Sequence, residues 1–151
     1  MKKNKIKINF YIKKYYKNYF PTIREINKWL KLIMLKNNEI TIHTVDIFEM
    51  KKINFIYCNK NYPTNILSFP SKISQYNNSL FLGDLIICPE IIKKESIIQK
   101  KLIKIHWAHI IIHGTLHLLG YNHYNIKQLN VMQKIEINTM KKLGYKNPYI
   151  I

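Results

Sequence analysis

Polar and apolar residues alternate along the first part of the chain, and longer apolar runs follow in the second half. Lysine and asparagine alternate with isoleucine and phenylalanine in KIKINFYI at 5–12, which is the two-residue period of a β-strand. Similar patterns predict strands at 39–47 and 66–69. A fourth strand is expected at 81–88, where FLGDLIIC is apolar enough for a buried position in a sheet.

Apolar residues at helical spacing predict five helices. The first opens at Pro21 and Thr22, and Pro89 stands where the first residue of a later helix is expected. Gly120 and Gly144 follow the last two helices, and glycine suits a position just past a helix end. The expected helical ranges are 21–33, 48–55, 89–99, 101–119 and 125–143.

Turn-forming and polar residues occupy the connections at 57–64 and 71–79. Strands come first along the chain and helices follow, which is an order typical of α+β proteins. A chain of 151 residues suits one compact domain. We therefore expect an α+β fold in a single domain over residues 1–151, with a small mixed β-sheet packed against several helices.

Composition narrows the class of protein. Hydrophobic residues make up 47% of the chain, which is enough for a core, and the two cysteines, Cys58 and Cys88, are too few for a disulfide scaffold. They indicate reduced thiols in a cytoplasmic protein. The longest apolar region, at 105–121, is interrupted by histidines, so no membrane-spanning segment is expected. The basic start lacks the apolar stretch of a signal peptide and is expected to be mature protein.

The formal net charge of +17 suggests a polyanionic partner, because clustered lysines attract phosphates. A second explanation exists. Arg24 is the only arginine, and isoleucine and asparagine are abundant, as in a sequence whose composition has drifted toward lysine, isoleucine and asparagine. Charge alone therefore leaves both explanations open, and a nucleic-acid partner needs support from the chemistry of a site.

The stretch HIIIHGTLHLLGYNH at 109–123 carries four histidines on an apolar segment. His113 and His117 are spaced i, i+4 and share one helix face, where two imidazoles converge well on a metal ion. His109 and His123 are the candidates for a third ligand. Three ligands on one straight helix diverge, whereas Gly120 lets the chain turn back toward the ion. The sequence therefore predicts one Zn²⁺ at the end of the central apolar helix, bound by His113, His117 and His123.

Other residues near this stretch have different expected roles. His106 and His109 are expected to pack in the core or the cleft, although His109 could also orient a ligand histidine. The histidine spacing is also that of metzincin proteases, whose motif HExxHxxGxxH places a glutamate after the first histidine as general base. Gly114 stands at that position here, so a metalloprotease of this type lacks its base.

Four blocks of the sequence carry a further signal. They are YPTNILSFP (62–70), LGDLIIC (82–88), HWAHIIIHGTLHLLGYNH (106–123) and LGYKNPY (143–149). In order and in spacing they resemble the YbeY family of bacterial endoribonucleases, whose metal positions match His113, His117 and His123. The resemblance implies a single-domain, zinc-dependent hydrolase of single-stranded RNA that acts in the cytoplasm, in 3′-end maturation of 16S rRNA and in ribosome quality control. Precursor 16S rRNA and the small ribosomal subunit are the implied partners, and neither DNA nor a membrane is expected.

The chain departs from the family pattern in three places. Cys58 stands where the family usually has an arginine, and a thiol cannot supply the guanidinium fork that grips phosphate. Lys60 is the candidate that replaces it as a point charge on the substrate. Asn122 replaces the aspartate of the histidine motif. The acidic stretch that usually follows the motif is mostly absent, and Glu136 is the main acidic residue left there. These changes bear on the catalytic rate more than on metal binding.

Two hypotheses follow, and no general base is assigned in either. The first is a metal-dependent endoribonuclease, and the alternative is a catalytically weakened rRNA-binding factor with a structural zinc. Tyr62 could stack on RNA bases, whereas Tyr121 is expected to pack beside the turn. Thr64 and Ser68 could point toward the cleft from the end of a strand, although a structural hydroxyl is the role expected of each. Asp84 is expected to be structural or to brace a ligand histidine.

Overall fold

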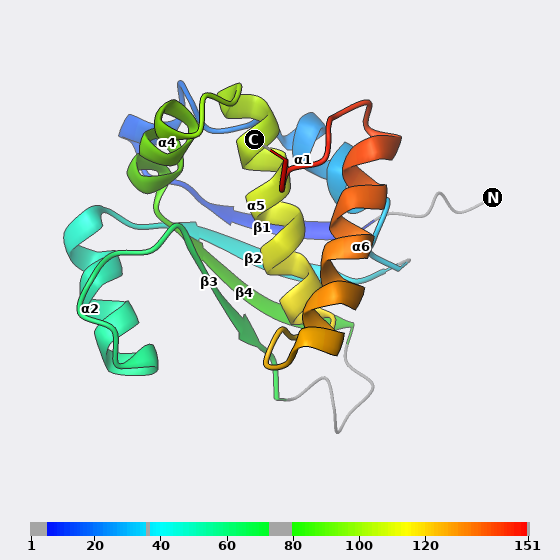
Figure 1. Ribbon diagram of the computed structural model, residues 1–151. Helices are drawn as coiled ribbons and strands as arrows, with labels where there is room; N and C mark the ends of the chain where they lie inside the picture. The colour runs from blue at the N-terminus through cyan, green and yellow to red at the C-terminus, as the bar shows by residue number, and fades with distance from the viewer. Residues whose placement is uncertain (1–5, 36, 73–79, 151) are drawn as a thin grey trace.

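The computed structural model describes residues 6–35, 37–72 and 80–150, and its centre is a four-stranded sheet (Figure 1). The strands are β1 (Lys7–Tyr11), β2 (Glu39–Thr44), β3 (Ile66–Pro70) and β4 (Phe81–Ile87). Their order is β1-β2-β4-β3. β1 and β2, and β2 and β4, pair in parallel, while β3 pairs with β4 in the antiparallel direction. The mixed sheet and the α+β class are therefore confirmed.

Helix α5 (Ile103–Leu118) lies at the centre of the helical layer and packs against β3 and β4. Figure 1 shows α6 beside it and α4 near its start, and α1 also contacts it. Among the described residues, no helix is both long enough and apolar enough to cross a membrane. The remaining elements are a short 3₁₀ helix η1 (Lys14–Tyr16) and the helices α1 (Ile23–Leu30), α2 (Ile47–Cys58), α4 (Pro89–Ile98) and α6 (Ile126–Lys142).

The core forms between α5 and one face of the sheet. Ile40, Ile42, Leu85 and Ile87 alternate along β2 and β4 and are fully buried under the helices. Burying each such side chain contributes about 1.5–3 kcal/mol. Among the described helices, only α2 packs near the other face, where its apolar residues form one cluster with Leu67 and Ile86. The expected burial of β4 therefore holds for every second residue, and its other side chains are half-buried.

Gly114 allows α5 to approach the sheet closely. A Cβ atom at this position would lie 2.4 Å from Ile66 Cδ1 and 3.1 Å from Leu85 Cδ2. The Ser68 hydroxyl donates to the Gly114 carbonyl oxygen over 2.8 Å, which ties β3 to the C-terminal half of α5. Ser68 is thus a structural hydroxyl, as expected. Because Gly114 has no side chain, the turns of α5 that carry His113 and His117 can lie close to β3.

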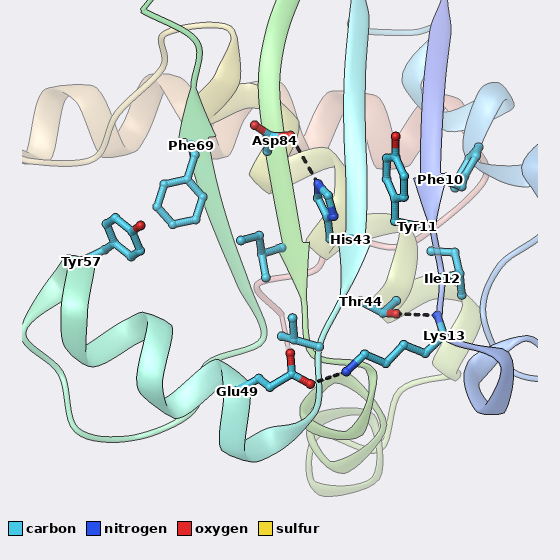
Figure 2. Close-up of a pocket in the computed structure, with 12 residues that line it drawn as sticks. Phe10, Tyr11, Ile12, Lys13, His43, Thr44, Glu49, Tyr57, Phe69 and Asp84 are labelled. Atoms are coloured by element: carbon cyan, nitrogen blue, oxygen red, sulfur yellow. Dashed lines mark hydrogen bonds and ion pairs between the residues drawn. The ribbon is translucent and has the colours of Figure 1, made fainter.

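The uncovered face of the sheet forms a hollow of about 830 Å³, drawn in Figure 2. Tyr11 stacks on His43 with ring centroids 4.9 Å apart, and His43 Nε2 lies 3.4 Å from Asp84 Oδ1. Lys13 pairs with Glu49 at the lower end of the hollow. Asp84 therefore points away from α5, and the expectation that it could brace a ligand histidine is wrong.

The ends of several elements differ from their predicted positions for local reasons. α2 begins one residue before the predicted helix at 48–55, because the Asp46 side chain caps its first turn by accepting from Glu49 N. It also runs three residues further, to Cys58, and the next residue, Asn59, has a left-handed φ of 55°. The predicted helix to residue 33 ends as a regular helix at Leu30 and continues as turns. Most of the polar loop predicted at 71–79 lies outside the described residues.

We expect the substitution Gly83→Ala to lower the free energy of unfolding by about 3 kcal/mol. Gly83 has φ +142°, and a Cβ atom there would lie 2.2 Å from the Phe69 carbonyl oxygen, which belongs to the backbone and cannot rotate away. Gly120 (φ +99°) is the matched control, because a Cβ atom there meets no atom within 4 Å. Gly120→Ala should cost only about 1 kcal/mol in urea unfolding. Equal losses would contradict the close approach of β3 and β4.

Candidate metal centre

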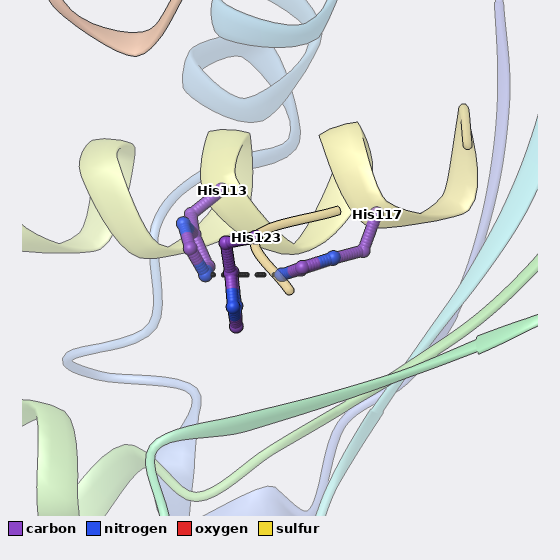
Figure 3. A group of neighbouring side chains, drawn as sticks. All are labelled: His113, His117 and His123. Carbon is purple, nitrogen blue, oxygen red and sulfur yellow. Dashed lines mark hydrogen bonds between the residues drawn. The ribbon is translucent and has the colours of Figure 1, made fainter. Parts of the chain in front are cut away.

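Three imidazole rings converge at the C-terminal end of α5 (Figure 3). His113 and His117 lie one turn apart on the helix, and their Nε2 atoms are 3.3 Å from each other. His123 comes from the segment after the helix, and its ring centroid lies 4.7 Å from that of His117 and 5.8 Å from that of His113. One ligand atom from each ring lies within 4.8 Å of the others. The structure thus brings together the three histidines that the sequence predicted, and the group could hold a metal ion.

The turn after α5 brings His123 back toward the helix. Gly120 N donates to His117 O over 3.1 Å, and Tyr121 N donates to Leu116 O over 3.0 Å. This pair of bonds is the Schellman arrangement, which needs a left-handed residue just past the helix end. Gly120 supplies it with φ +99°. The predicted role of Gly120 in reversing the chain between the second and third histidines is therefore confirmed.

In two of these rings the outer nitrogen, Nδ1, which does not face the other rings, has a hydrogen-bond acceptor. His117 Nδ1 donates to the Tyr121 carbonyl oxygen over 3.0 Å, and His113 Nδ1 lies 2.6 Å from Glu136 Oε1. A ring that donates through Nδ1 keeps a lone pair on Nε2 when it is neutral. Both Nε2 atoms then present lone pairs to the same point, an arrangement that a shared cation stabilises. Such bracing of the outer nitrogen is typical of metal-binding histidines.

Glu136 is a buried carboxylate with several partners. It has no exposed surface, and its Oε2 accepts from the Tyr149 hydroxyl over 2.5 Å. His109 Nε2 lies 3.3 Å from Oε1, the same oxygen that His113 contacts. Burial alone would raise the pKa of Glu136, but the hydrogen bonds from His109 and His113 outweigh it and lower the pKa to about 2. Glu136 is therefore ionised at neutral pH, and its negative charge favours a cation nearby.

The neutral form of His117 is also favoured. Burial, followed by the neighbouring rings of His113 and His123, lowers the pKa of His117 to about 4. Burial likewise lowers the pKa of His109, although Glu136 opposes the shift. An imidazole binds a metal only without its second proton, so His117 is ready to act as a ligand at neutral pH.

A cleft of about 590 Å³ opens over the three histidines. The loop after α2 forms its opposite wall, so the residues singled out from the sequence as possible substrate contacts, Cys58, Lys60 and Tyr62, line this cleft. Thr64 and Asn122 line it as well. The described lining holds no aspartate or glutamate. The cleft therefore offers cationic, thiol, amide and hydroxyl groups around the imidazoles.

Tyr121 and His106 have structural roles. The Tyr121 side chain lies in a separate hollow beside Leu116 and Ile135, as its expected packing role requires, and only its carbonyl oxygen serves the histidine cluster. His106 is buried and its Nε2 lies 3.1 Å from Glu95 Oε1. The expectation that His106 packs in the core is thus confirmed.

Sequence reasoning missed the contributions of Glu136 and Tyr149. Glu136 follows Met132 and precedes Met140 at helical spacing, and both methionines are buried. A carboxylate at a core position of an amphipathic helix must have hydrogen-bonding partners, and that signal was available. Tyr149 offered no such signal, because only the fold brings its hydroxyl to α6. His109 contacts both residues, which makes it part of the same network.

Comparisons with known proteins agree with these observations. A family model described as endoribonuclease YbeY matches residues 1–144. The chain is 52% identical over 128 residues to the endoribonuclease YbeY of Buchnera aphidicola subsp. Acyrthosiphon pisum, covering 82% of each chain. It is 46% identical over 133 residues to that of Wigglesworthia glossinidia brevipalpis, covering 85% of this chain and 88% of the relative.

The fold also resembles a solved structure. The solution structure of TM1509 from Thermotoga maritima matches with a TM-score of 0.55, covering 97% of this chain and all of that one. At 19% identity this likeness concerns the fold alone. The family model and the two relatives carry the assignment: the chain belongs to the endoribonuclease YbeY family.

Proposed function

We propose that this chain is a zinc-dependent endoribonuclease that hydrolyses phosphodiester bonds of single-stranded RNA. The observation that carries the proposal is the convergence of His113, His117 and His123 in an open cleft, with the outer nitrogens of two rings already held. Relatives named endoribonuclease support RNA as the substrate. We place its action in the cytoplasm, in 3′-end maturation of 16S rRNA and in ribosome quality control on the small subunit.

The donor set fits one Zn²⁺. Catalytic zinc commonly takes three protein ligands and leaves a position for water, and three imidazoles in an open cleft meet that requirement. Zinc bound there supplies Lewis acidity, which lowers the pKa of a water toward ~7 and polarises a phosphoryl oxygen. Glu136 is fully buried and cannot touch the substrate. Its role is to orient His113 and to keep the proton on the outer nitrogen of that ring.

The walls of the cleft bind the RNA strand. Lys60 is exposed at the cleft and neutralises a backbone phosphate as a point charge. Tyr62 is 55% exposed and offers a ring face on which a base can stack. Asn122 contributes an amide near the histidines.

A second candidate function is an rRNA-binding factor with a structural zinc. Cys58 favours it, because this exposed thiol lines the cleft at the position where the family usually carries an arginine. Loss of a guanidinium weakens the grip on phosphate without disturbing the histidines. Tight RNA binding without cleavage in the presence of zinc, manganese or magnesium would select this function.

Replacing His117 by alanine should reduce RNA cleavage at least about 100-fold, because two ligands hold zinc poorly. The measurement is cleavage of a labelled single-stranded RNA by the zinc-loaded protein, with circular dichroism to check folding. His43→Ala is the matched control, since His43 lies on the opposite face of the sheet. Equal cleavage by wild type and His117→Ala would remove the zinc mechanism.

Glu136→Gln should weaken zinc binding by about 10- to 100-fold, because a neutral amide orients His113 less firmly and removes a nearby negative charge. Competition with a chromogenic chelator measures the zinc Kd. Glu25→Gln on α1 is the control, because Glu25 pairs with Lys104 and Thr22 and does not line the cleft. An unchanged Kd for Glu136→Gln would show that the carboxylate does not support the site.

Cys58→Arg should increase RNA affinity and cleavage by about tenfold, since a guanidinium forms charge-assisted hydrogen bonds with phosphate. Cys88→Ser is an unsuitable control because Cys88 is buried, so Cys58→Ser serves as the matched variant. It should behave like wild type. If Cys58→Arg alters neither affinity nor cleavage, the assignment of this position to phosphate binding is wrong.

A further inference from the structure

A second hollow, of about 470 Å³, adjoins the metal-centre cleft. It lies between the start of α5 and the C-terminal segment 144–150. His109 lines both the cleft and this hollow, and Tyr149 of the cleft is followed directly by Ile150 of the hollow. The cleft and the second hollow therefore share a wall, which His109 forms together with the adjacent residues Tyr149 and Ile150.

The hollow combines apolar walls with a cationic rim. Leu102 and Ile105 form part of one wall, and Leu102 is 73% exposed although it is a large aliphatic side chain. Lys100 and Lys146 are exposed at the rim, and no carboxylate belongs to the described lining. A polyanion that also carries flat apolar surfaces matches this combination, because phosphates attract lysines and bases bury on aliphatic groups.

The walls are held in place by specific contacts. The Lys101 ammonium donates to the Pro148 carbonyl oxygen, which ties the C-terminal segment to the connection before α5. His106 lies at the bottom of the hollow with Nε2 held by Glu95, and its Nδ1 has no hydrogen-bonding partner among the described residues. Lys100 adopts a left-handed φ of 53° at the end of α4, a conformation that costs a non-glycine residue about 1–2 kcal/mol. These contacts fix the shape of the hollow, and the backbone of Lys100 at its rim is strained.

A row of histidines on α5 gives the distance between the two sites. The ring centroids of His113 and His109 are 6.2 Å apart, and those of His109 and His106 are 6.5 Å apart. His113 and His106 are seven residues apart, which is about 10 Å along the helix axis. A stacked single strand rises about 3.4 Å per nucleotide, so about three nucleotides cover this distance.

We propose that this hollow binds a nucleotide of the RNA strand about three positions from the bond placed over the histidine cluster. The base lies against Leu102 and Ile105, and the phosphate lies between Lys100 and Lys146. This inference rests on the proposed function, since it requires RNA in the adjoining cleft. It assigns a role to the C-terminal segment beyond the contact of Tyr149 with Glu136.

The first test measures binding without added metal, so it does not require hydrolysis. The Kd of a fluorescent twelve-nucleotide single-stranded RNA is measured by anisotropy for wild type and for the double variant Lys100→Gln, Lys146→Gln. Loss of the two lysines that hold this phosphate should weaken binding about tenfold and reduce the slope of log K against log salt by about 0.7. The control is Lys28→Gln, Lys31→Gln at the end of α1, where both lysines are exposed and line neither the cleft nor the hollow. Equal effects of the two double variants would overturn the proposal.

The second test varies the length of the RNA. Shortening the strand from one end should remove the difference between wild type and the Lys100, Lys146 variant once fewer than about three nucleotides extend toward the hollow. A difference that persists with the shortest strands overturns the proposal. If wild type binds as expected but never cleaves with zinc, the hydrolase function fails and the hollow stands. If it cleaves and the variant binds normally at every length, only the hollow fails.

Discussion

The buried carboxylate of Glu136 connects three parts of the chain that are far apart in sequence. It lies on α6, contacts His109 and His113 on α5, and accepts from Tyr149 near the C-terminal end. A buried charge is unfavourable unless it is fully hydrogen-bonded, so these partners are needed to stabilise the ionised form. The same bonds orient His113. The packing of α5 against α6 and the direction of a candidate ligand therefore depend on one group.

Pairing of histidines with carboxylates recurs in this strongly basic chain. The sequence has six histidines and only eight acidic residues. Glu136 serves His109 and His113, Glu95 serves His106, and Asp84 serves His43 on the uncovered face of the sheet. The pairs at His106 and His43 lie outside the cluster and complete local structure. The pairs at His109 and His113 support the cluster of His113, His117 and His123. Within the described part of the chain, this cluster is the only group of at least three His, Cys, Asp or Glu residues that could hold a metal.

The periodic parts of the fold could be predicted from sequence, and so could the histidine cluster. The i, i+4 spacing of His113 and His117 and the position of Gly120 are local, so the geometry followed from the properties of one helix and one turn. The strand order could not be predicted, because β2 pairs with β4 across more than thirty intervening residues. The uncovered face of the sheet depends on that order. The expected structural role of Asp84 is consistent with its contact to His43, but its alternative role beside a ligand histidine failed, and the partners of Glu136 were not identified.

His113 Nε2 and His117 Nε2 lie 3.3 Å apart, close enough for a hydrogen bond through one shared proton. Folding brings the two rings together, so this place between the nitrogens exists only in the native state. A metal ion that replaced the shared proton would bind only the native chain. Folding and ion binding would then be linked, and the stability of this fold would rise with the logarithm of the free ion concentration once that concentration exceeds the dissociation constant.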